Sequence, residues 1–235
     1  MEIKPYGEQA LIVDFDQSIT ETVHHSIVSI QGALHNDIKS GLIESIPGYQ
    51  SLVIVFDPSL TSFDHIKSII ENFGHNHDTF DQPSVTYTLP VCYDATFSLD
   101  MDRLKQRLGL SSHEIINLHT DKDYKIYATG FIPGFNYLGT LVDPLFGKRL
   151  SEPRKRVPQG AVGIAGRQTG IYPLASPGGW EILGRCPVPC FLPEAKNSFP
   201  FKVGDYIRFK AIDLEDFEHW SNTDWDHFNY ESFRN

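Results

Sequence analysis

The sequence predicts an α+β protein with two parts, a small N-terminal α/β domain over residues 1–80 and a β-rich, barrel-like domain over residues 85–235. Three observations predict this division. In the first part, apolar residues at helical spacing alternate with short apolar runs. The polar stretch HNHDTFDQPS at residues 75–84 is typical of a linker. Beyond it, the chain consists mostly of short strand-like runs separated by turns that contain glycine and proline.

The N-terminal domain begins with alternating strand and helix signals. The runs ALIVDF (residues 10–15) and LVIVF (residues 52–56) predict two short strands. Between them, apolar residues in positions 23–34 recur at intervals of four, three and four, which predicts a helix with one buried face. Ser18 and Glu21 stand three residues apart before this helix and predict a capping box at its start.

A second helix is predicted after the second strand. Apolar residues recur at helical spacing in positions 63–73. Gly74 is expected to end this helix, because glycine is common just past a helix terminus. The signals follow one another in a β-α-β-β-α-like order. They predict a small sheet with both helices packed on one of its faces.

The second domain is expected to start with a strand and two short helices. VTYTLPVCY at residues 85–93 has the strand pattern. Leucine spacing up to Leu108, with Gly109 directly behind it, indicates a short helix. Ser111 and Glu114 predict the capping box of another helix. Short strands and turns then continue to FKVGDYIRFKAI at residues 201–212.

The C-terminal tail from Asp213 onward is acidic and aromatic. It contains seven acidic residues against a single arginine, Arg234. Its large aromatic residues are Phe217, Trp220, Trp225, Phe228, Tyr230 and Phe233. Two outcomes are open for the tail: it packs back on the domain as short helices, or it docks on a partner.

Composition excludes several classes of protein. The chain has 30 acidic and 20 basic residues, a net charge of −10, whereas a nucleic-acid-binding protein usually shows a basic face or a basic total. The first residues contain no long apolar run after a basic region, so no signal peptide is predicted. No run of about 18 apolar residues is present, so no membrane span is predicted. The three cysteines fit a reducing cytoplasm, where we expect the protein.

One block, residues 130–185, differs from the rest of the chain. It holds 11 of the 18 glycines and 6 of the 15 prolines, and its seven basic and three acidic residues give it a charge of +4. Glycine permits close approach of the backbone to a ligand, and proline stiffens loops. The block therefore predicts either a rigid site for a small anion or an acidic partner, or a set of tight turns with solvated arginines.

Arginines are the strongest binding candidates in this block. Arg167 and Arg185 lie among glycines and apolar residues, and arginine binds a carboxylate or phosphate as a bidentate fork. Glu181 is either a general base or the salt-bridge partner of an arginine. Ser176 lies in A-S-P-G-G rather than in a hydrolase elbow, so we interpret it as a turn or ligand-contact residue. No P-loop and no complete set of metal ligands is evident, so neither a stand-alone P-loop ATPase nor a metal site is predicted.

Four motifs in the block resemble the signatures of the family of 5-oxoprolinase B subunits, also called the allophanate hydrolase subunit 1 or Kip-type kinase-inhibitor family. They are GF-x-PGF-x-YLG at 130–139, VP-x-G-x-VGIAG at 157–166, QTGIYP at 168–173 and SPGGWEILGR at 176–185. They occur in the family's order, and the resemblance covers essentially the whole chain.

The resemblance implies a small N-terminal α/β domain followed by a cyclophilin-like antiparallel β-barrel. It also implies an enzyme component, inactive alone, of a complex that hydrolyses 5-oxo-L-proline to L-glutamate. The implied partners are a carboxyltransferase-like protein (the C subunit) and a LamB/YcsF-type protein (the A subunit). ATP, with Mg²⁺, would be used by the complex, and the implied substrate is a small anion.

The resemblance further implies site residues. Catalytic roles would fall to Tyr172, Glu181 and Arg185. The substrate pocket would be formed by Phe131, Pro133, Gly134, Phe135, Tyr137, Arg156, Pro158, Gly160, Gln168, Thr169, Ser176, Gly178 and Trp180. Arg167 is added to this pocket from its own surroundings in the sequence, not from the resemblance. The chain departs from the family pattern at Arg167, where a small residue is usual, and an arginine there would narrow or recharge the site.

Two alternative functions remain open at the level of sequence. Some family members inhibit a sensor histidine kinase, and the stiff loop at 153–158 would then be the contact. A role in an allophanate hydrolase or urea carboxylase is less expected, because those versions are usually fused into much longer chains.

Overall fold

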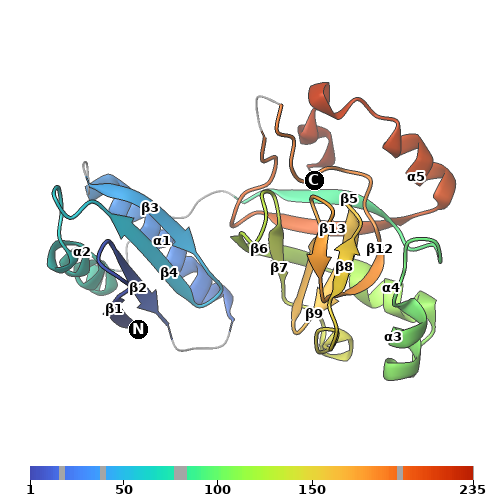
Figure 1. Ribbon diagram of the computed structural model, residues 1–235, viewed down its shortest axis with the longest axis horizontal. Coiled ribbons are helices and arrows are strands. Elements are labelled where there is room, and N and C mark those ends of the chain that lie inside the picture. Colours follow the sequence, from blue (N-terminus) through green and yellow to red (C-terminus); the bar gives the residue numbers. More distant parts are fainter. Residues whose placement is uncertain (16–18, 38–40, 77–83, 195–197, 235) are drawn as a thin grey trace. The chain divides into compact units, whose positions relative to one another are not determined.

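The computed structural model describes residues 1–15, 19–37, 41–76, 84–194 and 198–234. The chain divides into two compact units, Met1–Pro83 and Ser84–Asn235 (Figure 1). The predicted capping residue Ser18 and most of the predicted linker lie outside the described residues. Among the helices that the structure describes, none is both long and apolar enough to cross a membrane.

The first unit is built on a four-stranded antiparallel sheet with the order β1-β2-β4-β3. Its strands are β1 (Glu2–Pro5), β2 (Ala10–Asp14), β3 (Leu42–Pro47) and β4 (Ser51–Phe56). Side chains along β2 and β4 alternate between buried and half-buried, because successive residues of a strand point to opposite faces. One face of the sheet therefore carries the core of this unit.

Two helices, α1 (Glu21–Asp37) and α2 (Phe63–Asn76), cover that face. Their buried residues join those of β2 and β4 in a single apolar cluster, so both helices pack on the same side, as predicted. Helix α2 continues two residues past Gly74, where the sequence predicted its end. One glycine inside a helix costs only about 1 kcal/mol relative to alanine, so it does not by itself end a helix.

The second unit is a closed barrel with the strand order β10-β7-β6-β13-β5-β12-β9. The strands are β5 (Thr86–Cys92), β6 (Asp123–Thr129), β7 (Asn136–Gly139), β9 (Ala161–Ala165), β10 (Gln168–Ile171), β12 (Glu181–Arg185) and β13 (Tyr206–Ile212). The predicted barrel is confirmed, with one difference. Strands β5 and β13 pair in parallel, with Tyr206 opposite Thr86, whereas the other neighbouring pairs are antiparallel.

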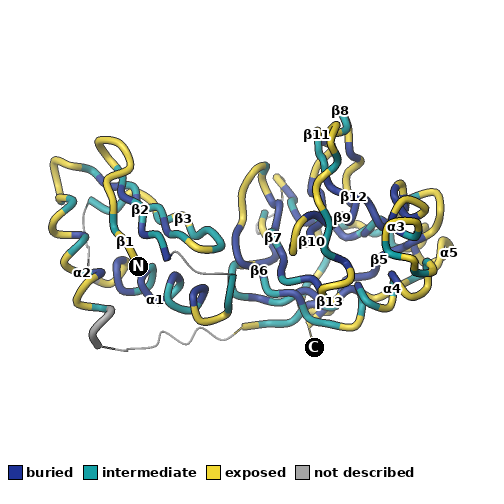
Figure 2. The backbone as a smooth tube through the Cα atoms, turned by 90° about the horizontal axis from the view of Figure 1, so that it is seen from below, coloured by how far each residue is buried: buried dark blue, intermediate teal, exposed yellow. Residues whose placement is uncertain are grey.

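The interior of the barrel is apolar. Figure 2 shows most of the barrel strands in the colour of buried residues. Two further strands, β8 (Arg154–Val157) and β11 (Ser176–Gly178), form a separate antiparallel ribbon that projects from the barrel in the same figure. The glycine- and proline-rich block therefore provides both barrel strands and this ribbon.

Two helices and a short 3-10 turn pack beside the barrel. Helix α3 (Met101–Leu108) ends at Gly109 in the left-handed conformation, and α4 (Ser112–Thr120) starts with the predicted capping box of Ser111 and Glu114. Helix α3 contacts β12, while α4 contacts β13 and the 3-10 turn η1 (Asp143–Leu145). These contacts bring α3 close to the start of strand β12.

The C-terminal tail packs back on the barrel as short helices, the first of the two outcomes considered above. It consists of α5 (Leu214–Ser221) and two 3-10 turns, η2 (Trp225–His227) and η3 (Tyr230–Phe233). Phe233 is buried in the barrel's apolar cluster, and other aromatic residues of the tail pack against that cluster. Helix α5 contacts β5, and in Figure 1 it lies above α3 and α4 at the same end of the second unit.

Candidate functional site

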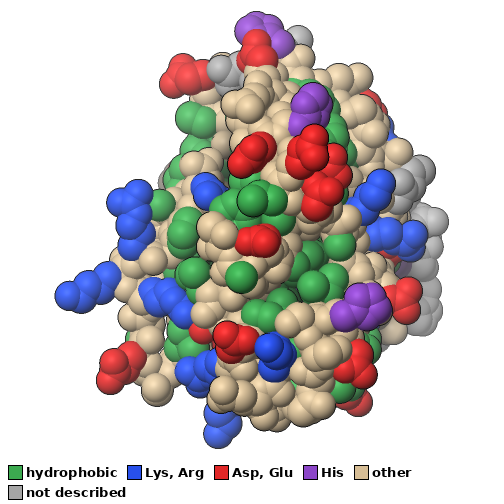
Figure 3. Space-filling view, turned by 90° about the vertical axis from the view of Figure 1, so that its right-hand side faces the viewer, with side chains coloured by type: hydrophobic (Ala, Val, Ile, Leu, Met, Phe, Trp, Pro, Cys, Tyr) green, Lys and Arg blue, Asp and Glu red, His purple; other side chains and the backbone are tan. Residues whose placement is uncertain are grey.

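The structure distributes the predicted site residues over several places in the second unit. Some line a small cavity around Arg185, others line a larger apolar cavity, and a third group is buried in an aromatic cluster. On the face shown in Figure 3, exposed apolar side chains lie among charged groups of both signs.

The first cavity, called here the Arg185 cavity, has a volume of about 220 Å³. It is lined by Gln159, Gly160, Tyr172, Pro173, Arg185, Cys186, Pro187, Val188, Pro189, Cys190, Phe217, Ser221 and Trp225. Three of the predicted site residues meet here: Gly160, Tyr172 and Arg185. The wall also includes residues of the C-terminal tail, which no motif indicated.

Arg185 is held in place without a carboxylate. Its Nε donates a hydrogen bond to the carbonyl oxygen of Gln159 at 2.9 Å. Its guanidinium carbon lies 5.6 Å from the ring centre of Phe97 and 5.7 Å from that of Phe217, within the range of cation–π contacts. Among the described residues, the terminal amino groups of Arg185 have no hydrogen-bond or ion-pair partner. These donors are available to a ligand in the cavity.

Glycine shapes this cavity by its lack of a side chain. Gly160 has φ +80°, and a Cβ there would clash with the carbonyl oxygen of Cys186. Its N–H donates to the carbonyl of Tyr172 at 2.7 Å. This amide is therefore already bonded within the protein. Gly160 therefore provides close approach of two backbone segments rather than a donor for a ligand.

Tyr172 is buried, and its hydroxyl packs closely against Gly178. A Cβ at Gly178 would clash with that hydroxyl, which also interacts with the backbone of Trp180. Burial raises the pKa of Tyr172, so the phenol stays protonated at neutral pH. The residue is part of the cavity wall.

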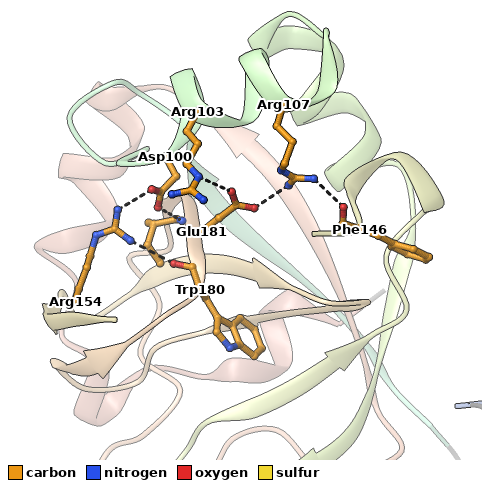
Figure 4. A network of polar contacts seen from close by, with 8 residues as sticks. Asp100, Arg103, Arg107, Phe146, Arg154, Trp180 and Glu181 are labelled. Atoms are coloured by element: carbon orange, nitrogen blue, oxygen red, sulfur yellow. Dashed lines mark hydrogen bonds and ion pairs between the residues drawn. The ribbon is translucent and has the colours of Figure 1, made fainter. Parts of the chain in front are cut away.

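Glu181 belongs to a network of charges (Figure 4). The carboxylate is 1% exposed, and it lies 3.3 Å from Nε of Arg103 and 2.7 Å from Nη2 of Arg107. Arg107 also donates to the carbonyl of Phe146 at 2.7 Å. Of the two roles considered from sequence, this geometry supports the salt-bridge partner, because both oxygens already have cationic partners.

A second carboxylate extends this network. Asp100 accepts from Nη2 of Arg154 at 2.7 Å and from the backbone N–H of Ile182 at 2.6 Å. Arg154 also donates to the carbonyl of Trp180 at 3.4 Å. The network ties the start of α3 to β8 and β12 (Figure 4). The sequence offered one signal for it: Arg103 and Arg107 stand four residues apart, on one face of a helix.

Several predicted pocket residues form an aromatic cluster. The ring of Phe135 lies 4.8 Å from that of Tyr137, 5.3 Å from Tyr172 and 5.4 Å from Trp180. Phe135, Tyr172 and Trp180 are all buried, and Val157 packs with them. These motif residues therefore form a small apolar core beside the barrel. An apolar motif alone does not show whether its residues line a pocket or pack in a core.

The first loop of the motif lines a second cavity. This cavity has a volume of about 600 Å³ and is mainly apolar. Its wall consists of Thr129, Gly130, Phe131, Ile132, Pro133, Gly134, Asn136, Cys190, Phe199, Phe201, Lys202 and Val203. Phe131 is 63% exposed and has φ 68°, in the left-handed region that favours glycine. Gly134 has no room for a Cβ beside Phe191 and Cys190.

Arg167 lies apart from Arg185. Sequence suggested that both line one pocket, but Arg167 is exposed, lines neither cavity and places its guanidinium 4.3 Å from the ring centre of Phe146. Arg156 and Pro158 are likewise exposed, on β8 and just after it. None of these three contributes to the wall of the Arg185 cavity.

Thr169 forms part of a buried polar chain. Its hydroxyl donates to the carbonyl of Gly163 at 3.0 Å and therefore accepts from Nε2 of His119 at 2.9 Å. Nδ1 of His119 then accepts from the hydroxyl of Tyr93 at 2.8 Å. Burial lowers the pKa of His119 to about 3, so the imidazole is neutral and satisfied on both nitrogens.

The other polar candidates serve backbone pairing or lie buried. Gln168 is half-buried and pairs with Gly139 and Ala165 across neighbouring strands. Ser176, on β11, is buried, and its Oγ donates to the carbonyl of Pro177 at 3.3 Å. The side chains that the structure describes form no group of three or more His, Cys, Asp or Glu residues suited to a metal ion.

The sequence of this chain is similar to a known family and to characterised proteins. Residues 1–201 match the family model of the carboxyltransferase domain, subdomain C and D. The 5-oxoprolinase B subunit of Bacillus subtilis (strain 168) is 30% identical over 227 residues, which cover 92% of this chain and 95% of the relative. The 5-oxoprolinase B subunit of Escherichia coli O157:H7 is 31% identical over 204 residues, covering 86% of this chain and 92% of the relative.

Solved structures share the fold. A crystal structure of TTHA0988 is 32% identical with a TM-score of 0.77, and the match covers 87% of this chain but only 40% of that longer chain. The conserved uncharacterized protein PH0987 from Pyrococcus horikoshii is 35% identical with a TM-score of 0.54, covering 92% of this chain and 100% of that chain. The K. lactis urea amidolyase, at 15% identity and a TM-score of 0.79, shows the same fold over 98% of this chain.

Proposed function

Because this chain belongs to the family of the carboxyltransferase domain, subdomain C and D, we propose that it is the B subunit of a 5-oxoprolinase. The complex would hydrolyse 5-oxo-L-proline to L-glutamate and consume ATP. Two relatives of that name, each at least 30% identical over nearly their whole length, support the proposal. The partners would be the carboxyltransferase-like C subunit together with the LamB/YcsF-type A subunit. The free, buried state of all three cysteines is consistent with a complex in the cytoplasm.

The single observation that carries the role of this chain is the set of free donors on Arg185. The substrate is a five-membered lactam with a carboxylate. A guanidinium fixed by Gln159 and two aromatic rings presents a rigid fork to such a group. Each hydrogen bond to a charged group contributes roughly 1.5–3 kcal/mol, so two would hold a small acid firmly.

The size of the Arg185 cavity also suits this substrate. A water molecule occupies about 30 Å³ in the liquid, so a cavity of about 220 Å³ has room for a ligand of seven or so water volumes. That matches a small ring with a carboxylate. Pockets for drug-sized ligands measure roughly 300–1,000 Å³, which is larger than this cavity. We therefore assign no step of ATP chemistry to this cavity.

In the proposed reaction, this chain binds and orients the substrate. The ring C–N bond breaks, water supplies the new carboxylate oxygen, and the nitrogen leaves as an amine. Arg185 would hold the existing carboxylate and thereby fix the position of the lactam. Glu181 is not placed to act as the base, because Arg103 and Arg107 occupy its carboxylate. The groups that activate the amide would come from the partner subunits.

The test is glutamate formation from 5-oxo-L-proline and ATP. The A and C subunits are assayed with this chain and again without it. We expect glutamate only when the chain is present. Replacing Arg185→Ala should lower kcat/KM at least 100-fold while the complex still assembles, because two charge-assisted bonds are lost.

Arg208→Ala provides the matched control. Arg208 forms a surface pair with Asp123 through two bonds of 2.5 and 3.0 Å, and neither residue lines the cavity. Its loss should leave kcat/KM within about twofold. Glutamate formation without this chain, or full activity of Arg185→Ala, would contradict the proposal. A well-assembled complex that forms no glutamate would point to a different lactam or to kinase regulation.

A further inference from the structure

The C-terminal tail builds one wall of the Arg185 cavity. Phe217 and Ser221 of α5 and Trp225 of η2 all line it. The family model ends at residue 201, so these residues lie beyond the part of the chain that it describes. The tail covers the barrel's apolar surface, and it also shapes the Arg185 cavity.

Phe217 acts directly on Arg185. The rings of Phe97 and Phe217 lie 4.4 Å apart, and the guanidinium carbon of Arg185 is at nearly equal distance from both. An aromatic face attracts a guanidinium and orients its plane. Helix α5 is fixed at its start, where the side chain of Asp213 accepts from the N–H of Asp216 at 2.8 Å. Phe217, one turn from this cap, is consequently held in position.

The rest of the tail anchors this wall to the barrel. The hydroxyl of Tyr230 donates to the carbonyl of Pro189, a residue of the cavity wall, at 3.0 Å. The rings of Trp220 and Trp225 stack with their centres 6.1 Å apart. Phe233 is buried in the barrel's apolar cluster. A wall anchored at several points limits ligand size, because it does not retreat without disturbing this packing.

We propose that the C-terminal tail is the specificity-determining wall of a small-carboxylate site, with Phe217 positioning Arg185 and Trp225 limiting the size of the ligand. The inference rests on the proposed function for the identity of the acid. The carboxylate would bind the terminal amino groups of Arg185. The body of the ligand would lie against Trp225 and the proline-rich segment that contains Pro187 and Pro189.

The first experiment measures binding to the full chain by calorimetry. The probes are 5-oxo-L-proline and pyrrolidin-2-one, which has the same ring without the carboxylate. We expect saturable binding of the acid and at least tenfold weaker binding of the neutral lactam. Phe217→Leu should weaken binding of the acid roughly fivefold through loss of the cation–π contact, and Phe217→Tyr, which keeps the ring, should restore it.

The second experiment tests the size limit. Trp225→Ala and the milder Trp225→Leu enlarge the cavity, so the affinity ratio should shift at least fivefold toward the six-membered homologue, 6-oxopiperidine-2-carboxylate. Phe228→Leu is the matched control, because Phe228 belongs to the same aromatic packing of the tail but does not line the cavity. Thermal melting confirms that each variant is folded.

The outcomes separate this inference from the proposed function. An unchanged affinity in Phe217→Leu, or an unchanged size preference in both Trp225 variants, would overturn the role of the tail. So would the absence of saturable 5-oxoproline binding to the wild-type chain, both alone and in the assembled complex. Tail-dependent binding of the acid together with no glutamate formation would support the site while contradicting the oxoprolinase assignment.

Discussion

Strand β12 carries a charged residue at each end, and the two residues have contrasting surroundings. Glu181, at its start, is buried and bound by Arg103 and Arg107 of helix α3. Arg185, at its end, is held by two aromatic rings and one carbonyl oxygen. Its terminal amino groups have no partner within the described part of the chain. One end of the strand is an internally satisfied network, whereas the other presents unused donors.

This contrast distinguishes a charged residue that stabilises the fold from one that is available to bind a ligand. The sequence of β12 shows only that both residues are charged. A buried charge must be paired, because removing it from water is costly unless protein groups replace the hydration. The Glu181 network meets that requirement with protein groups alone and so stabilises the junction of α3 and β12. Arg185 is only half-buried and borders a cavity, so its terminal amino groups are accessible to solvent or to a ligand. The following predictions test each side of this contrast.

The largest expected effect on stability is that of Glu181→Gln. The neutral amide leaves two arginines without their shared carboxylate, and breaking a buried pair typically costs about 3–5 kcal/mol. Arg103 is 56% exposed and recovers hydration, so we expect a loss of about 2–4 kcal/mol in the free energy of unfolding of the second unit. Tryptophan fluorescence during urea unfolding measures this unit alone, because Trp180, Trp220 and Trp225 are the only tryptophans.

The control for this variant is Glu231→Gln. Glu231 forms an exposed ion pair with Arg234 three residues away, and such pairs contribute at most about 1 kcal/mol. A loss below about 1 kcal/mol in Glu181→Gln would show that the network is not a stabilising element. The distinction between the two ends of β12 would then fail.

The next effect is a pH dependence of the free energy of unfolding that arises from His119. This residue is hydrogen-bonded on both ring nitrogens and is neutral. Its pKa is lowered from 6.5 to about 3 in the folded state, so the unfolded chain takes up the proton first as pH falls. The stabilising contribution is fully present above pH 6.5 and declines toward pH 3, by about 1.4 kcal/mol per pH unit. At pH 5 the second unit should be about 2 kcal/mol less stable than at pH 7 through this group alone.

His119→Gln isolates this contribution. Glutamine offers an acceptor to Tyr93 and a donor to Thr169 but does not titrate. Urea unfolding at a series of pH values should show a shallower decline between pH 6.5 and about 5 than in the wild-type chain. Equal slopes in the two proteins would mean that His119 is not the titrating group.

Arg185→Lys tests the other end of β12, where the donors are expected to bind a ligand. Lysine keeps the charge but lacks the planar fork and stacks less well on Phe97 and Phe217. We expect KM for 5-oxo-L-proline in the assembled complex to rise about tenfold, equivalent to about 1.4 kcal/mol, with little change in the stability of the second unit. If KM does not change, a point charge is sufficient and the fork is not what binds the carboxylate. Arg208→Lys, in a surface pair with Asp123, is the control.

Sequence reasoning predicted elements whose determinants are local. The capping box of Ser111 and Glu114, the left-handed Gly109 and the helices of the first unit follow from spacing within a few residues. The parallel pairing of β5 with β13 joins residues 120 positions apart, Thr86 and Tyr206, and no local pattern encodes that direction. The tail's return to the barrel depends in the same way on distant packing.

The candidate site was predicted in part, for the same reason. Three residues of the motifs, Gly160, Tyr172 and Arg185, meet at one cavity. The motifs did not reveal Phe97 and Phe217, since the partners of Arg185 lie 88 residues before it and 32 after it. They also grouped Phe135 and Trp180 with the pocket, although both are buried in the aromatic cluster. Glycine and aromatic spacing marks close packing, whether or not a ligand takes part.

The smallest expected effect is that of Arg167→Ala, which tests whether the two arginines of the block are really different. Arg167 is exposed and contacts the ring of Phe146, so its loss should cost about 0.5–1 kcal/mol of stability at most. Because it lines neither cavity, kcat/KM of the assembled complex should stay within about twofold of wild type. A tenfold fall would restore the sequence-based prediction that Arg167 joins Arg185 in one site. It would also show that free donors on a cavity wall are not sufficient to identify the binding arginine.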